Sequence, residues 1–242
     1  MNTHAGILLV ATRRYKIFLK PLLEQIDKFF LPKEELTVFL FTDEEYLYDE
    51  SKYDFVIKQF QIPSYGFPDA TILRYKTFHE HYEAMKNCSH LYYLDVDMKI
   101  VASIGDEFLV DGLIAVRHPG TYATDRWGSP NNSKISMSWF PEEKRKHYYC
   151  GGVQGGKSEH YLHACEVLCD GIEIDRKNGV MAEWHDESFW NFYTNFQRPD
   201  LVTELSPAYC MPESKEHQVS WGLSEFTPII IALNKNHKEM RG

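Results

Sequence analysis

The sequence lacks a long apolar run, a secretion signal and a cysteine pattern suited to disulfides or metal. No stretch approaches the roughly 20 apolar residues that a membrane-spanning helix requires, and the N-terminus shows no charged segment followed by an apolar one. The five cysteines are an odd number without C-x-x-C spacing, and Cys165 and Cys169, four residues apart, are too few ligands for a metal site. These absences predict a soluble cytoplasmic protein with reduced thiols.

The sequence also lacks the features of several nucleotide-binding and nucleic-acid-binding classes. A net charge of −9, from 26 basic and 35 acidic residues, disfavours a general nucleic-acid binder, which needs a basic surface to neutralise phosphates. No G-x-G-x-x-G follows the first predicted strand, so a dinucleotide-binding motif is not indicated. The 242 residues show no internal repeat and suffice for one substantial core.

Apolar periodicity predicts strands that alternate with helices along most of the chain. Such alternation predicts an α/β fold with a parallel or mixed sheet covered by helices. A polar segment at 122–137 is expected to form a long surface loop, and the basic end at 234–242 is expected to be disordered unless a ligand orders it. The predicted strands are 6–11, 36–41, 56–57, 91–94, 114–116 and 228–233, and the predicted helices are 15–30, 70–85, 158–169 and 187–196.

Asp95-Val96-Asp97 is the most informative segment of the chain. It follows the apolar run 91–94, and alternate residues of a strand point to the same face, so the two carboxylates are expected side by side. Two unit charges about 4 Å apart repel by roughly 4 kcal/mol at an effective dielectric near 20. A positive group is therefore expected beside them, and a divalent cation shared with a phosphorylated substrate is the natural candidate. An exposed D-x-D in a solvated turn is the alternative.

Three further polar clusters follow predicted strands, at residues 12–15, at Asp43 and at His118. Active sites on such sheets gather at the carboxyl ends of the strands. These clusters are therefore expected to converge with Asp95 and Asp97, and their coincidence is more informative than any one of them.

The segment Trp184-His185-Asp186-Glu187-Ser188 precedes a predicted amphipathic helix. Asp186 could simply cap that helix, with Glu187 in its first turn. Three ionisable groups beside an indole also supply the parts of a sugar site, because the ring can pack on an apolar sugar face and carboxylates can bind hydroxyls or act on an anomeric carbon. Both interpretations stay open from these residues alone.

Two glycine pairs and a basic tail complete the candidate features. The pairs Gly151-Gly152 and Gly155-Gly156 allow close approach of a ligand to the backbone, as a bulge or a tight turn. The tail is either solvated or folds over a diphosphate and neutralises a leaving group. Its basic residues are Lys235, His237, Lys238 and Arg241.

Taken in order, nine segments resemble glycosyltransferase family six, which includes the histo-blood-group A and B transferases and their bacterial relatives. The resemblance spans nearly the whole chain, and the ordered combination is more specific than any single segment. The segments are ATRRY (11–15), FLFTD (39–43), DATILR (69–74), DVDM (95–98), HPG (118–120), YYCGGVQGG (148–156), WHDES (184–188), LSPAY (205–209) and KNH (235–237).

The resemblance implies a GT-A glycosyltransferase fold, a Rossmann-like mixed sheet flanked by helices. It implies one catalytic domain over 1–242, with a nucleotide-binding half at about 1–100, an acceptor-binding half at about 101–233 and the basic tail at 234–242. The implied activity is retaining transfer of GalNAc or Gal from a UDP-sugar, in α1,3 linkage, to a galactoside acceptor that is often 2-fucosylated.

The resemblance also implies roles by matched position. Asp95 and Asp97 would hold Mn²⁺ or another divalent cation and, through it, the diphosphate. Glu187 would lie beneath the anomeric carbon, as nucleophile or as stabiliser of an oxocarbenium-like transition state. The further donor contacts would be Thr12, Tyr15, Arg74, Cys150, Gly151, Gly152, Asp186, Lys235 and Arg241, and the acceptor contacts would be His118, Trp184 and Glu213.

Individual positions bear on the substrates. Gly152 is similar to the glycine of family members that use GalNAc, where Gal users tend to carry Ala, and the missing methyl leaves room for an acetamido group, a distinction of about 1–3 kcal/mol. Phe67 stands where Trp is usual, and the Tyr-Glu-Arg-Arg segment common before Tyr148 is absent, which leaves the acceptor open. The chain shows no anchor or stem like those of the vertebrate enzymes, as expected of a bacterial or phage-type cytosolic member.

Two other classes compete with a transferase. One is a non-catalytic UDP-sugar or glycan-binding module derived from a transferase, which the joint presence of Asp95, Asp97 and Glu187 disfavours. The other is a nucleotidyltransferase on a similar sheet, which should carry more basic residues early in the chain than Arg13 and Arg14.

Overall fold

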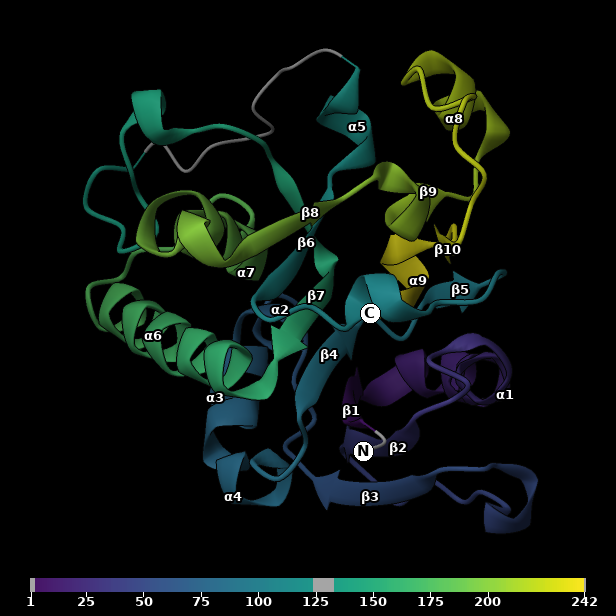
Figure 1. The fold of residues 1–242 in the computed structure, drawn as a ribbon. Helices are drawn as coiled ribbons and strands as arrows, with labels where there is room; N and C mark the ends of the chain where they lie inside the picture. The colour runs from purple at the N-terminus through teal and green to yellow at the C-terminus, as the bar shows by residue number, and fades with distance from the viewer. Residues whose placement is uncertain (1–2, 124–132, 242) are drawn as a thin grey trace.

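A seven-stranded mixed sheet forms the centre of the molecule (Figure 1). The computed structural model describes residues 3–123 and 133–241. The strands of this sheet are β1 (His4–Ala11), β2 (Glu35–Thr42), β3 (Val56–Gln61), β4 (His90–Leu94), β6 (Leu113–Arg117), β7 (Tyr149–Lys157) and β8 (Val202–Leu205). Their spatial order is β3-β2-β1-β4-β7-β6-β8, and β7 alone runs antiparallel to its neighbours in the described sheet. The predicted mixed α/β architecture is confirmed.

A second, three-stranded sheet adjoins the first and begins at the carboxylate segment. Its strands are β5 (Met98–Ile100), β9 (Met211–Pro212) and β10 (Ile230–Ala232), in the order β5-β10-β9. The pairing continues one residue beyond β10, where the backbone N–H of Leu233 donates to the carbonyl of Asp97 at 3.0 Å. This hydrogen bond brings the end of the chain to the carboxylates.

The helices cover both faces of the central sheet (Figure 1). Among the described residues none of them combines the length and the apolar character needed to cross a bilayer. The α-helices are α1 (Leu19–Phe29), α2 (Asp69–Ile72), α3 (Arg74–Glu80), α4 (Tyr82–Met85), α5 (Pro119–Tyr122), α6 (Ser158–Lys177), α7 (His185–Phe192), α8 (Lys215–Ser220) and α9 (His237–Arg241).

The two faces of the sheet carry separate apolar cores. Ile7 and Leu9 of β1 join the core under α1, whereas Leu8 between them joins the core under α3 and α6. Alternate side chains of a strand point to opposite faces, so a strand covered on both sides reads as a continuous apolar run. In Figure 1, α1 lies on one side of the sheet and α3, α6 and α7 lie on the other.

Two predicted helices are shorter in the structure than in the sequence pattern. The segment expected to be helical from residue 15 begins as a 3-10 helix (Arg13–Phe18), and α1 starts only at Leu19, because Pro21 lacks an N–H and is tolerated only in a first turn. The segment 70–85 divides into α2, α3 and α4, with breaks at Leu73 and His81. At the second break the His81 imidazole bonds to the carbonyl of Thr77 at 2.8 Å.

The later helices also differ from their predicted bounds. α6 runs eight residues past the predicted end at 169, and α7 gives way to a π-helix (Tyr193–Gln197). The carboxamide of Asn191 accepts from the N–H of Tyr149 at 2.8 Å and donates to its carbonyl at 2.7 Å. These two bonds fix the start of β7 against α7.

The chain end is ordered, contrary to the expectation for 234–242. Residues 237–241 form α9, in which Met240 is buried and Glu239 accepts a hydrogen bond at its carbonyl from Arg14 at 3.1 Å. The burial of Met240 and the hydrogen bond from Arg14 therefore order residues 237–241 in spite of their polar composition. Of the predicted loop 122–137, residue 122 closes α5 and residues 124–132 lie outside the described part of the chain.

The order of the strands creates a switch point between β1 and β4. From β1 the chain proceeds to β2 and β3 on one side, and then returns to add β4 on the other side. Ligands of open α/β sheets bind at the carboxyl ends of the strands where the order reverses. Thr12 and Asp95 directly follow these two strand ends, so the fold places both residues where a ligand is expected to bind.

Candidate active site

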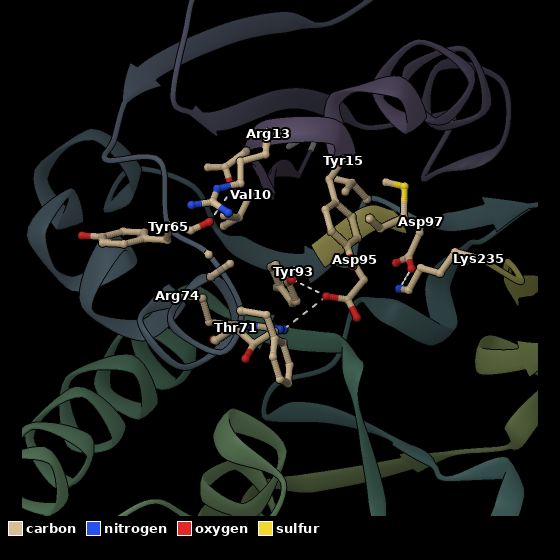
Figure 2. Close-up of a pocket in the computed structure, with 16 residues that line it drawn as sticks. Val10, Arg13, Tyr15, Tyr65, Thr71, Arg74, Tyr93, Asp95, Asp97 and Lys235 are labelled. Carbon is tan, nitrogen blue, oxygen red and sulfur yellow. Dashed lines mark hydrogen bonds and ion pairs between the residues drawn. The ribbon is translucent and has the colours of Figure 1, made fainter. Parts of the chain in front are cut away.

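Asp95 and Asp97 lie in a turn between β4 and β5 rather than on a strand. The backbone N–H of Asp95 donates to the carbonyl of Gly152 at 2.9 Å, and the N–H of Met98 donates back to the carbonyl of Asp95 at 3.1 Å. The expectation of two neighbouring side chains on one strand face is therefore wrong, because the chain turns here from the first sheet into the second. Both carboxylates nevertheless border the same cavity (Figure 2).

Each carboxylate of this turn has its own cation. Arg74 Nη1 lies 3.4 Å from Asp95 Oδ1, and the hydroxyl of Tyr93 donates to the same oxygen. The ammonium of Lys235 pairs with Asp97, whose side chain is buried. The positive group expected beside the two charges is thus present twice, as dashed lines in Figure 2 show.

The guanidinium of Arg74 is buried at the centre of the site. Besides Asp95 it reaches Asp186, with 3.2 Å between Nη2 and Oδ2, and donates to the carbonyls of Gly151 at 3.2 Å and Thr71 at 3.0 Å. Its Cζ lies 4.2 Å from the ring centroid of Tyr93, within cation–π range. Burial alone would lower the pKa of Arg74, but Asp186, Tyr93 and Asp95 outweigh it and raise that pKa.

One guanidinium cannot neutralise every carboxylate around it. Burial raises the pKa of Asp186 to about 7, and the charges of Asp95 and Glu187 act in the same direction, whereas Arg74 opposes them. A raised pKa of this kind is typical of functional sites, where burial and like charges are placed together.

Glu187 projects from the first turn of α7 toward β7. Its Oε2 accepts from the backbone N–H of Gly151 at 2.8 Å, and the hydroxyl of Tyr148 lies near the same carboxylate. Burial, followed by the charge of Glu187, raises the pKa of Tyr148. The hydrogen bond from the backbone orients this carboxylate.

The start of α7 is conformationally strained. His185 adopts a φ of 51°, in the left-handed region that costs energy for a residue with a Cβ. The ring of Phe67 packs edge-on against the His185 imidazole with 5.0 Å between centroids, and Ser188 Oγ accepts from the N–H of Trp184 at 3.0 Å. The N-cap interpretation of Asp186 is wrong, because Trp184 occupies the N-cap position and Asp186 faces Arg74 from the first turn of the helix.

Two adjacent cavities share Arg74 and Asp95 in their walls. The first cavity, of about 190 Å³, lies at the switch point and also contains Lys235 in its wall. The second cavity lies beside it toward α7. Of the residues named from the sequence, Thr12, Tyr15 and Asp97 line the first cavity, and Gly151, Gly152, Trp184, Asp186 and Glu187 line the second.

The turn at residues 95–97 is called the carboxylate turn below. A third opening, called the groove, lies on its other side. Asp95 and Asp97 border it together with His118 and Lys235. His118 caps α5, and its Nδ1 accepts from the N–H of Gly120 at 3.1 Å. The predicted convergence of His118 with the two carboxylates at one edge of the sheet therefore agrees with the structure.

Gly152 approaches the carboxylate turn too closely for a side chain. A methyl group built on it would lie 2.8 Å from Asp95 Oδ2 and would also collide with the end of the Met98 side chain. The neighbouring Gly151 leaves slightly more space, since a methyl there would lie 3.1 Å from Asp186 Oδ2.

Three residues named from the sequence, Asp43, Cys150 and Glu213, lie apart from these cavities. Asp43 braces the turn after β1, where it accepts from the N–H of Arg13 at 2.9 Å and from Ser64 Oγ at 2.7 Å. Cys150 is buried and its thiol faces Cys210. Glu213 is exposed and accepts from the N–H of Asn234 at 2.9 Å. The side chain of Arg241 lies outside the described part of the chain.

Two tyrosines of the site were missed by motif reasoning. In the sequence Tyr93 is part of an apolar run, although its position two residues before Asp95 could have indicated that the two side chains lie close together. Tyr148 was noted only within the glycine-rich segment. No sequence signal connects it with Glu187, because the contact depends on how α7 packs on β7.

The carboxylate pair suits a hard divalent cation only in combination with another ligand. Within residues 3–123 and 133–241 no group of three or more His, Cys, Asp and Glu side chains is arranged to hold a metal ion. Asp95 and Asp97 offer two oxygen ligands at the first cavity, and Mg²⁺-type sites often combine one or two carboxylates with substrate phosphates and water. The residues present therefore fit a cation shared with a phosphorylated ligand.

A mixed sheet flanked by helices, with acidic side chains and a buried arginine at its switch point, defines a glycosyltransferase of GT-A type. The model of glycosyltransferase family 6 matches residues 1–242, and the chain belongs to that family. The resemblance inferred from the nine segments is confirmed.

Curated relatives cover both animal and bacterial enzymes. Histo-blood group ABO system transferase 1 of Rattus norvegicus is 27% identical over 99% of this chain and 69% of its own length. Globoside alpha-1,3-N-acetylgalactosaminyltransferase 1 of Homo sapiens is 27% identical over 95% of this chain and 67% of its own length. The O-antigen biosynthesis glycosyltransferase WbnI of Escherichia coli is 26% identical over 86% of this chain and 88% of its own length.

The raised pKa of Asp186 predicts a pH dependence of stability. The pKa of Asp186 is near 3.8 in the unfolded state and about 7 in the folded state. At pH values between these two, the folded state binds more protons than the unfolded state, so this group makes the free energy of unfolding fall as pH rises. The slope is at most about 1.4 kcal/mol per pH unit. We expect Asp186→Asn to flatten it in urea titrations of the metal-free protein, whereas Asp170→Asn, on an exposed site of α6, should not. Equal slopes in wild type and Asp186→Asn would contradict the assignment.

Proposed function

We propose that the protein is a retaining glycosyltransferase that moves GalNAc, or Gal, from a UDP-sugar in α1,3 linkage to a galactoside acceptor, which we expect to be 2-fucosylated. Membership of family 6 supports the class of enzyme. The name of the human relative, an alpha-1,3-N-acetylgalactosaminyltransferase, supports the linkage and the donor.

The orientation of Glu187 carries this proposal. Its carboxylate is oriented by the N–H of Gly151 in the second cavity, beside Arg74 and Asp186. A protein that only binds sugars does not need an oriented carboxylate at this position, whereas a retaining transferase needs one at the anomeric carbon.

The reaction breaks the bond between the anomeric carbon and the β-phosphate oxygen, and the electron pair leaves with UDP. The acceptor hydroxyl oxygen forms the new bond to the anomeric carbon, and its proton passes to the departing phosphate oxygen. Glu187 stabilises the developing positive charge on the sugar ring, or forms a transient bond to the carbon from the opposite face. Asp186 and Arg74 bind hydroxyls of the donor sugar and orient it.

The first cavity supplies the nucleotide contacts in this proposal. Thr12 and Tyr15 border it at the end of β1 and contact the uridine, and Lys235 contacts the diphosphate. Asp95 and Asp97 would hold Mn²⁺ or another divalent cation, which when bound adds Lewis-acid stabilisation of the departing phosphate. Residues 1–100 thus serve mainly the nucleotide, and residues 101–233 mainly the acceptor, with His118 and Trp184 as its contacts.

The alternative is a non-catalytic module that binds a UDP-sugar or a glycan. Both alternatives predict binding of UDP, so affinity alone does not separate them. Turnover that depends on an acceptor does, because only a transferase couples release of UDP to a second sugar.

We expect UDP release from UDP-GalNAc, with Mn²⁺ present, to require 2′-fucosyllactose as acceptor. Glu187→Gln should lower this turnover by about 10²-fold or more while UDP affinity stays nearly intact, because the amide retains the shape but not the charge. Glu183→Gln, at an exposed position of the preceding turn, is the matched control. Full turnover in Glu187→Gln would remove this residue from the mechanism, and UDP binding without turnover by the wild type would favour the module.

Gly152→Ala should change the choice of donor. The added methyl would press on Asp95 and Met98 and narrow the space beside the donor sugar. Transfer of the bulkier GalNAc should therefore be slowed more than transfer of Gal. We expect the ratio of kcat/KM for UDP-GalNAc over UDP-Gal to fall by roughly 10-fold or more. An unchanged ratio would show that the acetamido group lies elsewhere.

Lys235→Met should separate metal binding from nucleotide binding. Without a donor, Lys235 pairs with Asp97, so its removal should raise Mn²⁺ affinity, measured by electron paramagnetic resonance of the free ion, by at least about 10-fold. The same variant should bind UDP more weakly, because a cation facing the diphosphate is lost. Lys238→Met, exposed on α9, should change neither affinity. Weaker Mn²⁺ binding by Lys235→Met in the absence of UDP would exclude this competition.

A further inference from the structure

Beyond the carboxylate turn, the groove continues past the sugar-transfer site to α8. Its volume of about 300 Å³ exceeds that of the first cavity, and it begins at Asp95 and Asp97, where the two meet. The far part of the groove is bordered by His217 and Trp221, which none of the proposed catalytic or donor-binding roles involves.

His217 and Trp221 form a parallel aromatic pair at the end of α8. Their ring centroids are 4.7 Å apart and their planes differ by 3°, because residues four apart lie on the same side of a helix. Ser214 caps this helix by accepting from the N–H of His217 at 3.2 Å, which fixes the residue that carries the imidazole. The two rings are therefore stacked in a preformed arrangement, in which one face of each ring is turned away from the other ring.

The aromatic pair lies next to the expected position of the acceptor galactose. A methyl group built on Gly120 would lie 3.2 Å from His118 Cε1 and 3.8 Å from Trp221 Cη2. Gly120 thus stands between the imidazole assigned to the acceptor and the indole of the pair. Two rings separated by a single glycine suit two adjacent sugars of one oligosaccharide.

The exposure of the pair also distinguishes it from core aromatics. His217 is exposed and Trp221 is half-buried, whereas Trp190 of α7 is fully buried in the core. Pyranose rings present apolar C–H faces that pack on aromatic rings, and ligand sites combine such surfaces with a few polar groups. Here the polar groups are the His118 side chain and the two carboxylates at the other end of the groove.

We propose that His217 and Trp221 form a binding subsite for the next sugar of the acceptor, the neutral hexose linked to the anomeric carbon of its galactose. This inference rests on the proposed function and deepens it. The physiological acceptor is then an oligosaccharide in which the galactose is followed by at least one further sugar, and the aromatic pair selects it over a shorter galactoside.

The test compares two acceptors that differ by one sugar, 2′-fucosyllactose and methyl 2-O-fucosyl-β-galactoside. We expect Trp221→Ala to lower the ratio of kcat/KM for the longer over the shorter acceptor by roughly tenfold, and Trp221→Phe to restore most of it. Val219→Ala, at an exposed position of the same helix, should leave the ratio unchanged. An unchanged ratio in Trp221→Ala would overturn the subsite.

A binding measurement on the wild-type protein gives a second readout that does not depend on folding of a variant. Saturation-transfer NMR with UDP and 2′-fucosyllactose should show strong transfer to the glucose protons, comparable to that of the galactose. Transfer confined to galactose and fucose would overturn the subsite while leaving the proposed function in place. Absence of sugar transfer by the wild type to either acceptor, in turn, would overturn the proposed function and this inference together.

Discussion

The buried guanidinium of Arg74 is the interaction on which the rest of the site depends. It joins α3 to the carboxylate turn through Asp95, to β7 through the carbonyl of Gly151 and to α7 through Asp186. These elements lie far apart in sequence, and side chains of α3, β4, β7 and α7 pack together in one apolar core. Removing one partner of a buried ion pair commonly costs about 3–5 kcal/mol, so the ion pairs of Arg74 add an electrostatic constraint to this packing in fixing the relative positions of turn, strand and helix.

The balance of charge at the switch point favours a further cation. Within the described part of the chain, Asp95, Asp97, Asp186 and Glu187 face two cationic side chains, Arg74 and Lys235. A site with this excess of negative charge would repel the diphosphate of the proposed donor unless Asp186 were protonated or positive charge were added. A divalent cation held by the two carboxylates would supply that charge. Burial is the largest cause of the raised pKa of Asp186, and the same excess of negative charge adds to it, since protonation relieves part of the repulsion.

The elements that sequence patterns predicted well are those in which local periodicity and tertiary burial agree. β1, β2, β4 and β6 were placed to within about a residue or two because strands buried on both faces are continuously apolar. The helix predicted over 70–85 failed at Leu73 and His81, where the chain bends. Arg74 follows the first of these breaks, so the residue at the centre of the site was hidden in a pattern that looked like an ordinary helix, and only the family resemblance named it.

The end of the chain also shows contacts that local sequence patterns do not predict. The composition of 234–242 predicts a solvated basic tail. In the structure, however, Lys235 forms an ion pair with Asp97, and Met240 is buried beside the first cavity. No local pattern contains this information, because both partners are more than a hundred residues away and are created by the fold. Lys235 occupies at Asp97 a position that a divalent cation would also take. In the proposed function, the diphosphate would offer Lys235 a second partner. Binding of the nucleotide would then move this ammonium from Asp97 to the ligand and make the carboxylate available, which would couple the order of the chain end to the loading of the site.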